Sequence, residues 1–139
     1  EEAHITESHE VRQLMQDKRL KKAIKIKKRA LVPTEIGDVK KADTLVIAWG
    51  SNRGVLEESL DRVKDEKIAG LHFSQVYPLP KEAKKLFSKK KIVVLENNAE
   101  GQFANLLRLE YDVKITERIL KYNGAPFAIE EVVAKIKSL

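Results

Sequence analysis

The stretch from Lys91 to Tyr111 constrains the fold more than any other part of the chain. It opens with an unbroken apolar run, Ile92 to Leu95, in which three of the four residues are β-branched. A strand with one wet face alternates apolar and polar residues, whereas a strand covered on both faces stays apolar throughout. The run therefore predicts a strand inside a parallel sheet that has helices on both sides.

A polar turn and a helix follow this strand. Residues 96–101 are rich in turn formers and include Gly101, which can adopt positive φ. From Phe103 the apolar spacing changes to about 3.6 residues, so that Phe103, Leu107 and Tyr111 share one helical face. In α/β folds, a polar loop at the carboxyl end of a central strand commonly carries the functional site.

The same strand–turn–helix pattern recurs along the chain. We expect further strands at 44–49 and 68–73, one or two short edge strands within 113–121, and helices at 55–66, from Pro80 to about 87, at 103–111 and at 129–137. Alternation of this kind predicts an α/β fold, a three-layer sandwich with a mainly parallel sheet of about five strands and right-handed crossovers.

A basic helix precedes this domain. We expect it from about residue 9 to 30, with Thr6 or Ser8 as its cap, and Pro33 ends it. Its apolar residues form a short stripe that continues imperfectly towards the linker: Val11, Leu14, Met15, Leu20, Ile24 and Leu31. We divide the chain into a basic helical arm and linker, residues 1–42, with a short extended piece around 32–36, and an α/β domain, residues 43–139.

The charge of the chain is concentrated in that arm. The net charge is +6, and residues 1–30 hold nine Lys/Arg and five Asp/Glu, which leaves +2 for the remainder. A basic surface attracts phosphate or an acidic partner. Nucleic-acid or membrane-surface binding is one interpretation, but no aromatic residue lies among the charges to stack on bases. We favour an arm that docks its thin stripe on the domain or on a neighbouring subunit.

Composition excludes several kinds of site. The chain has no Cys, so it holds no disulfide, thiolate zinc site or Cys-ligated iron–sulfur cluster of its own. No apolar run approaches the roughly 20 residues of a membrane span and no signal peptide is visible, so we expect a cytoplasmic protein. A charged content of 35% is also found in thermophile proteins. Because the sequence begins with Glu, we interpret it as a fragment of a longer protein.

No arrangement of side chains points to catalysis. His4 and His9 are five residues apart, not the four of metal-binding pairs on a helix. His72 ends a strand, where a neutral, hydrogen-bonded core histidine is commoner than a general base. Glu96 has no obvious acidic partner, and Ser51 lies outside a nucleophile elbow. We therefore predict no catalytic, cofactor-binding or metal-binding residue.

Four motifs carry a resemblance to a known family. They are W-G-S-N-R-G at 49–54, L-H-F-S-Q-V-Y-P-L-P at 71–80, E-N-N-A-E-G-Q-F-A-N-L-L-R at 96–108 and R-I-L-K-Y-N-G-A-P-F at 118–127. In this order they resemble the C-terminal domain of the α subunit of 2-oxoacid:ferredoxin oxidoreductases, nearest to the 2-oxoglutarate branch. The lead-in E-E-A-H-I-T-E-S is similar to the link out of that subunit's preceding domain.

The resemblance implies a role within a larger enzyme. Members of the family decarboxylate a 2-oxoacid on thiamine diphosphate with magnesium, pass electrons through iron–sulfur clusters to ferredoxin, and form an acyl-coenzyme A. The matching domain is similar to the C-terminal domain of transketolase and builds subunit contacts, while other domains and chains hold the cofactors. The implied partners are the β subunit and other subunits, the preceding domain of the same chain, and ferredoxin and coenzyme A at the level of the complex.

We expect the matched loops to meet at the carboxyl edge of the sheet and to face neighbouring domains. Large rigid rings supply much of an interface's energy, so Trp49 and Tyr77 are suitable anchors. Replacing Tyr77 and Phe103 is expected to weaken subunit association more than it perturbs the isolated fold. The candidate interface residues are Trp49, Ser51, Asn52, Tyr77, Pro78, Asn97, Asn98, Gly101, Gln102 and Phe103.

The residues alone also allow a free-standing nucleotide- or coenzyme A-binding α/β module. In that alternative the turn at Gly50–Gly54 would hold an anion at the start of the following helix. The sequence contains neither G-x-G-x-x-G nor G-K-[ST], so the motif match is poor.

Overall fold

Runs of apolar residues build the sheet that the sequence predicts. The computed structural model describes residues 5–139, and its strands are β1 (Thr34–Ile36), β2 (Thr44–Trp49), β3 (Ile68–Phe73), β4 (Lys91–Glu96) and β5 (Glu117–Leu120). The strand order is β1-β3-β2-β4-β5. β1 is antiparallel to β3, and the other neighbouring pairs are parallel. The mainly parallel α/β fold is thereby confirmed.

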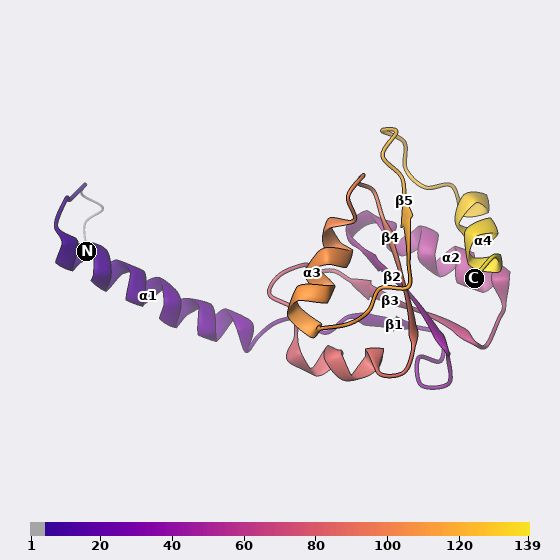
Figure 1. Cartoon of the computed structure of the whole chain (residues 1–139), viewed down its shortest axis with the longest axis horizontal. Coiled ribbons are helices and arrows are strands. Elements are labelled where there is room, and N and C mark those ends of the chain that lie inside the picture. Colours follow the sequence, from indigo (N-terminus) through magenta and orange to yellow (C-terminus); the bar gives the residue numbers. More distant parts are fainter. Residues whose placement is uncertain (1–4) are drawn as a thin grey trace.

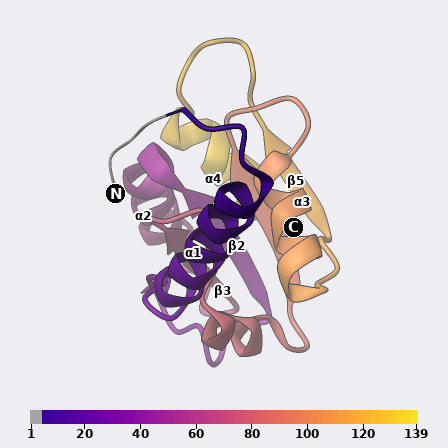
Figure 2. The same ribbon diagram turned by 90° about the vertical axis from the view of Figure 1, so that its left-hand side faces the viewer.

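Helices cover both faces of the sheet and make three layers (Figure 1). α2 (Arg53–Val63) and α4 (Ile129–Lys137) pack against each other on one face, and α3 (Gln102–Tyr111) with the 3₁₀ helix η2 (Lys81–Phe87) lies on the other. Viewed from the side of the N-terminal helix, the two layers lie to either side of the sheet (Figure 2). Alternate residues of the central strands serve the two cores, so that Ile47 and Val94 face α3 while Val46 and Leu95 face α2.

One of the expected helices differs in type from the prediction. Residues 81–87 form a 3₁₀ helix, because the carbonyl of Pro80 accepts the backbone N–H of Ala83 at 3.1 Å. The hydroxyl of Tyr111 donates to the same carbonyl at 2.7 Å, and burial raises the pKa of Tyr111. Within 113–121 one edge strand forms, β5, in agreement with the one or two short strands expected, and Thr116 just before it bonds Ile92 through both its backbone N–H and its side-chain hydroxyl.

The stretch that we predicted as arm and linker contributes to the sheet domain. β1 is the antiparallel edge strand, and Val39 and Ala42 are buried in the core beneath α3 and η2. The division of the chain between residues 42 and 43 stays a prediction. Residues before it contact residues after it, because β1 pairs with β3 and because Val39 and Ala42 belong to the same core as the later strands and helices.

α1 (His9–Lys27) projects away from the sheet domain (Figure 1). Ser8 caps it, as expected, by accepting the N–H of Val11 on its hydroxyl at 3.3 Å. No residue of α1 is buried. At roughly 100° per residue, Leu20 and Ile24 lie on the face opposite Val11 and Met15. The single apolar stripe that we expected along this helix is therefore wrong, since the apolar residues form two short patches on opposite faces.

Substitutions at two glycines, Gly70 and Gly54, test how tightly the sheet packs against α2. A Cβ added at Gly70 would lie 2.8 Å from Leu60 Cδ1 and 3.2 Å from both Ile36 Cβ and Leu56 Cδ2, whereas one at Gly54 meets no atom within 4 Å. Gly70→Ala should lower the free energy of unfolding by about 1–3 kcal/mol through overpacking. Gly54→Ala, within α2, should raise it by about 0.5–1 kcal/mol. Urea unfolding of both variants measures this, and equal effects would contradict the packing.

Candidate functional site

The loops that follow β2, β3, β4 and β5 lie at the carboxyl edge of the parallel strands. The candidate interface residues in these loops differ in exposure. Ser51, Tyr77, Asn97 and Gln102 are exposed, Trp49 and Asn98 are half-buried, and Asn52, Pro78, Gly101 and Phe103 are buried. Tyr77, with 53% of its surface exposed, is the aromatic candidate most available to a partner. The assignment of these residues to an interface stays a prediction.

Glu96 is the most deeply buried polar side chain at this edge, with 0% exposed. It ends β4 on the α3 face of the sheet, two residues beyond Val94. Its carboxylate accepts the backbone N–H of Phe103 at 2.9 Å and of Ala104 at 3.1 Å, and the side-chain amide of Asn98 at 2.6 Å. The backbone N–H groups of Phe103 and Ala104 belong to the first turn of α3 and have no partner inside the helix. Glu96 therefore caps α3 from the neighbouring strand.

Asn98 completes this arrangement from within the loop. Its side-chain oxygen accepts the N–H groups of Glu100 at 3.2 Å, Gly101 at 2.6 Å and Gln102 at 3.2 Å. Gly101 adopts φ +66°, a conformation that favours glycine. Internal oxygen atoms therefore occupy the positions at the start of α3 where a phosphate would otherwise bind, and the loop is held by hydrogen bonds to Glu96 and Asn98.

Phe103 lies in the core and not on the surface. It is 3% exposed and packs against Phe73 at 5.3 Å and Trp49 at 6.1 Å between ring centroids. The expectation that replacing Phe103 weakens association more than it perturbs the isolated fold stays a prediction, and the burial of Phe103 means that such a change also opens a cavity in the core. The indole N–H of Trp49 is buried and has no hydrogen-bond partner among residues 5–139.

His72 has the environment expected of a core histidine. It is 4% exposed, and its Nε2 donates to the carbonyl of Gly50 at 2.8 Å, while its Nδ1 has no partner in the described part of the chain. Gly50–Asn52 forms a 3₁₀ turn, η1, that leads directly into α2. The exposed start of a helix does not by itself identify a ligand, so anion binding at this turn stays a prediction.

No group of His, Asp and Glu side chains among residues 5–139 is arranged to hold a metal ion. His9 lies exposed on α1, and His4 lies outside the described residues. Also within this range, no helix is both long and apolar enough to cross a membrane.

Arg118 makes a loop contact that the sequence pattern did not indicate. Its guanidinium donates to the side-chain oxygen of Asn105 on α3 at 2.7 Å. Its stem covers Gly101, where an added Cβ would lie 2.9 Å from Arg118 Cδ. Gly101 and Arg118 lie in different motifs of the sequence, and only the pairing of β5 with β4 brings them together.

Comparisons with known proteins agree on one family. No family model matches the sequence. Subunit alpha of 2-oxoacid:ferredoxin oxidoreductase from Saccharolobus solfataricus is 30% identical over 141 residues, covering 97% of this chain and 22% of the relative. The solved structure of 2-oxoglutarate:ferredoxin oxidoreductase from Magnetococcus marinus with 2-oxoglutarate, coenzyme A and succinyl-CoA bound superposes with a TM-score of 0.79 at 26% identity. That match covers 96% of this chain and 24% of the other.

The chain is homologous to a segment of the 2-oxoacid:ferredoxin oxidoreductase α subunits. It spans about a fifth of the length of the curated relatives it matches. The alpha chain of a probable 2-oxoacid ferredoxin oxidoreductase from Thermoplasma acidophilum is also similar, with a TM-score of 0.52 and 28% identity. In that case the match covers 77% of this chain and 95% of the other.

Two substitutions in this chain give a direct test of the Glu96 cap. Glu96→Gln replaces one carboxylate oxygen by an amide that faces a backbone donor, so one buried N–H of α3 loses its acceptor. We expect the free energy of unfolding to fall by about 1–3 kcal/mol, with faster hydrogen exchange at Phe103 and Ala104. Glu100→Gln, in the same loop but exposed, is the control and should change stability by less than about 0.5 kcal/mol. Equal effects of the two changes would contradict the capping role.

Proposed function

We propose that this chain is a non-catalytic assembly domain of the α subunit of a 2-oxoacid:ferredoxin oxidoreductase, acting in the C-terminal part of that subunit. The parent enzyme would convert a 2-oxoacid and coenzyme A to acyl-coenzyme A and CO₂ while reducing ferredoxin. The substrate of the Magnetococcus marinus structure favours 2-oxoglutarate. The expected cytoplasmic location is part of the same proposal.

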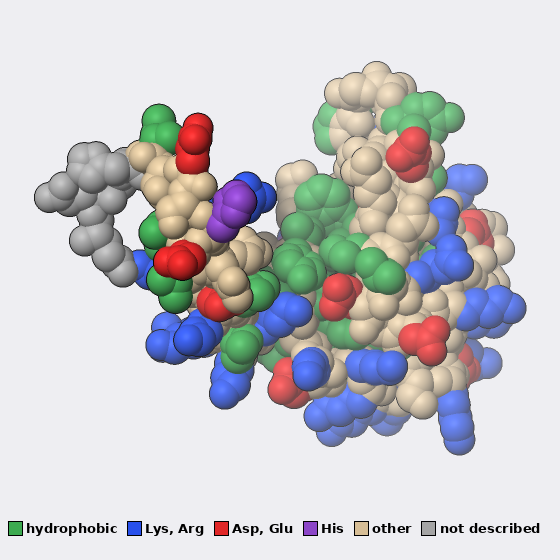
Figure 3. All heavy atoms as spheres, turned by 60° about the vertical axis from the view of Figure 1, so that its left-hand side comes forward, with side chains coloured by type: hydrophobic (Ala, Val, Ile, Leu, Met, Phe, Trp, Pro, Cys, Tyr) green, Lys and Arg blue, Asp and Glu red, His purple; other side chains and the backbone are tan. Residues whose placement is uncertain are grey.

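The observation that carries the proposal is the exposure of α1. This helix has 19 residues, none buried, and it projects from the sheet domain. In proteins, most of the stability of a helix comes from packing an apolar face on other structure, and α1 buries no residue within the described part of the chain. Its exposed Leu14 and Leu20 lie on different faces, and hydrophobic side chains are visible both on the arm and on the part of the domain beside it (Figure 3). We infer that other polypeptide covers α1 in the assembled enzyme.

The described residues do not fit thiamine diphosphate with magnesium. A magnesium ion bound to a diphosphate needs carboxylate or amide oxygens that are free to coordinate it. The oxygen of Asn98 is not free in this way, because it accepts three backbone N–H groups, and no G-D-G precedes the pair Asn97–Asn98. Glu96 is likewise engaged by the start of α3. We therefore assign cofactor binding, iron–sulfur clusters included, to other parts of the parent enzyme.

The carboxyl edge of the sheet is the second contact surface that we propose. Tyr77 and the half-buried Trp49 present aromatic surface there, and large rigid rings are common anchors of interfaces. The β subunit and the preceding domain of the same α subunit are the partners that the family resemblance favours.

Tyr77→Ser tests this edge. The change should weaken association of the parent α subunit with its partner subunits about tenfold or more, because an exposed aromatic anchor is lost. The unfolding free energy of the chain should change by less than about 0.5 kcal/mol, since Tyr77 is outside the core. Native mass spectrometry and urea unfolding measure the two quantities. Lys84→Ser, which changes an exposed residue on η2, is the control and should leave association unchanged. Unchanged association of the Tyr77 variant would count against the interface.

Calorimetric titration of the chain with nucleotides and with coenzyme A separates the proposal from the free-standing binding module. The proposal predicts no heat of binding to the chain alone. Saturable binding that is lost in Gly54→Val, at the start of α2, would favour the module.

A further inference from the structure

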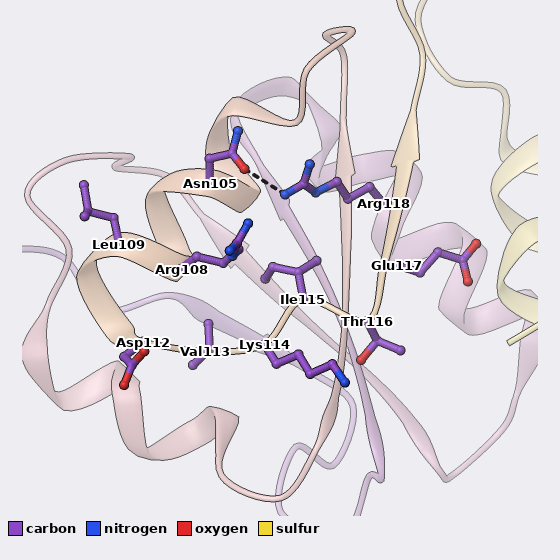
Figure 4. Close-up of a pocket in the computed structure, with 10 residues that line it drawn as sticks. All are labelled: Asn105, Arg108, Leu109, Asp112, Val113, Lys114, Ile115, Thr116, Glu117 and Arg118. Atoms are coloured by element: carbon purple, nitrogen blue, oxygen red, sulfur yellow. Dashed lines mark hydrogen bonds between the residues drawn. The ribbon is translucent and has the colours of Figure 1, made fainter.

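A groove of about 1030 Å³ runs between α3 and the segment that leads into β5 (Figure 4). Asn105, Arg108 and Leu109 line it from α3, and Ile115 and Arg118 line it from the opposite side. β5 is an edge strand that pairs only with β4 among the described strands. The groove therefore lies beside a sheet edge whose outer backbone groups are open to a partner.

Two arginines face the same space across this groove. Figure 4 shows Arg108 reaching in from α3 and Arg118 from β5, while the carboxylates of Asp112 and Glu117 point away from them. Arg118 is fixed by its bond to Asn105 and by its stem over Gly101. No ion pair to either arginine forms within residues 5–139. Both arginines therefore bring positive charge to this groove, which an anion bound there would neutralise.

The groove also has an apolar side. Leu109 is 80% exposed at its rim, and Val113 and Ile115 are half-buried along it. A free phosphate would neutralise the arginines but leave Leu109 in water. An extended peptide beside an edge strand presents alternate side chains to the same surface, so it can satisfy both features.

We propose that this groove docks an acidic polypeptide segment of a partner subunit. A carboxylate of that segment binds Arg108 and Arg118 together, and an apolar side chain covers Leu109. The inference rests on the proposed function, because the segment belongs to another part of the same oxidoreductase.

Peptide binding to the full chain tests the groove. The probe is a fluorescein-labelled peptide with the repeat Leu-Ser-Glu-Ser, in which Leu and Glu lie two residues apart and so share one face of an extended chain, and binding is followed by fluorescence anisotropy. Arg108→Glu should weaken binding about tenfold or more, since a charge-assisted contact becomes a repulsion. Leu109→Ser should weaken it severalfold without any change of charge. Lys84→Glu, on η2, changes the net charge by the same amount as Arg108→Glu and should leave the affinity within about twofold.

Two outcomes overturn the docking proposal. The first is an equal loss of affinity in Arg108→Glu and Lys84→Glu, which would indicate attraction by overall charge. The second is displacement of the peptide by inorganic phosphate at equal concentration, which would identify a small-anion site.

Arg118 needs a milder substitution because its side chain packs on Gly101. Arg118→Lys keeps the charge but loses the two-pronged geometry of the guanidinium, and it should still weaken binding.

Assembly of the parent enzyme separates this inference from the proposed function. If Tyr77→Ser weakens association and Arg108→Glu does not, the groove proposal fails and the assembly role stands. If the unmodified chain does not join the other subunits at all, the proposed function fails, and the partner named here fails with it. Weakening by both variants supports both proposals.

Discussion

The carboxylate of Glu96 is the interaction on which the rest of the carboxyl edge depends. It links the end of β4 to the first turn of α3 through two backbone N–H groups, in a place with no exposure to water. A carboxylate acceptor suits this place because the start of a helix carries partial positive charge. This link holds the start of α3 at the end of β4, and Asn98 holds the loop between them.

This cap also limits what the edge can do chemically. An α/β sheet commonly binds anionic ligands where a helix begins beyond a strand, and here an internal side chain already fills that position at α3. The edge then presents a fixed surface with an exposed tyrosine, beside a groove with two arginines. Together with a helix that buries none of its residues, these features suit a domain that makes contacts with other polypeptides. The homology to a segment of a longer α subunit agrees with that interpretation.

Sequence patterns predicted the parts of this structure that depend on burial alone. The unbroken run Ile92 to Leu95 marked β4, and spacing by two from Val94 places Glu96 on the α3 face. The helical face of Phe103, Leu107 and Tyr111 is the buried face of α3. The sequence-derived resemblance to the oxidoreductase family was confirmed by the comparisons.

The remaining features depend on neighbours that are distant in the sequence. β1 lies within the short extended piece expected around residues 32–36, but its antiparallel pairing depends on β3, which is far away in the sequence. The 3₁₀ form of η2 follows the bonds made by the Pro80 carbonyl, one of them from Tyr111. Phe103 is a candidate interface residue in a polar motif, and its ring packs on Trp49 of β2 and Phe73 of β3, which are distant in the sequence. The Arg118–Gly101 contact likewise requires the β4–β5 pairing.

Hydrogen exchange along α1 tests the central claim most directly. Amide exchange at residues 9–27 should be measured in the chain alone and in the assembled parent enzyme. If other polypeptide covers this helix, exchange should be fast in the chain alone and at least about tenfold slower in the assembly. Equal exchange in the two states would contradict the claim that this chain exists to make contacts within a larger enzyme.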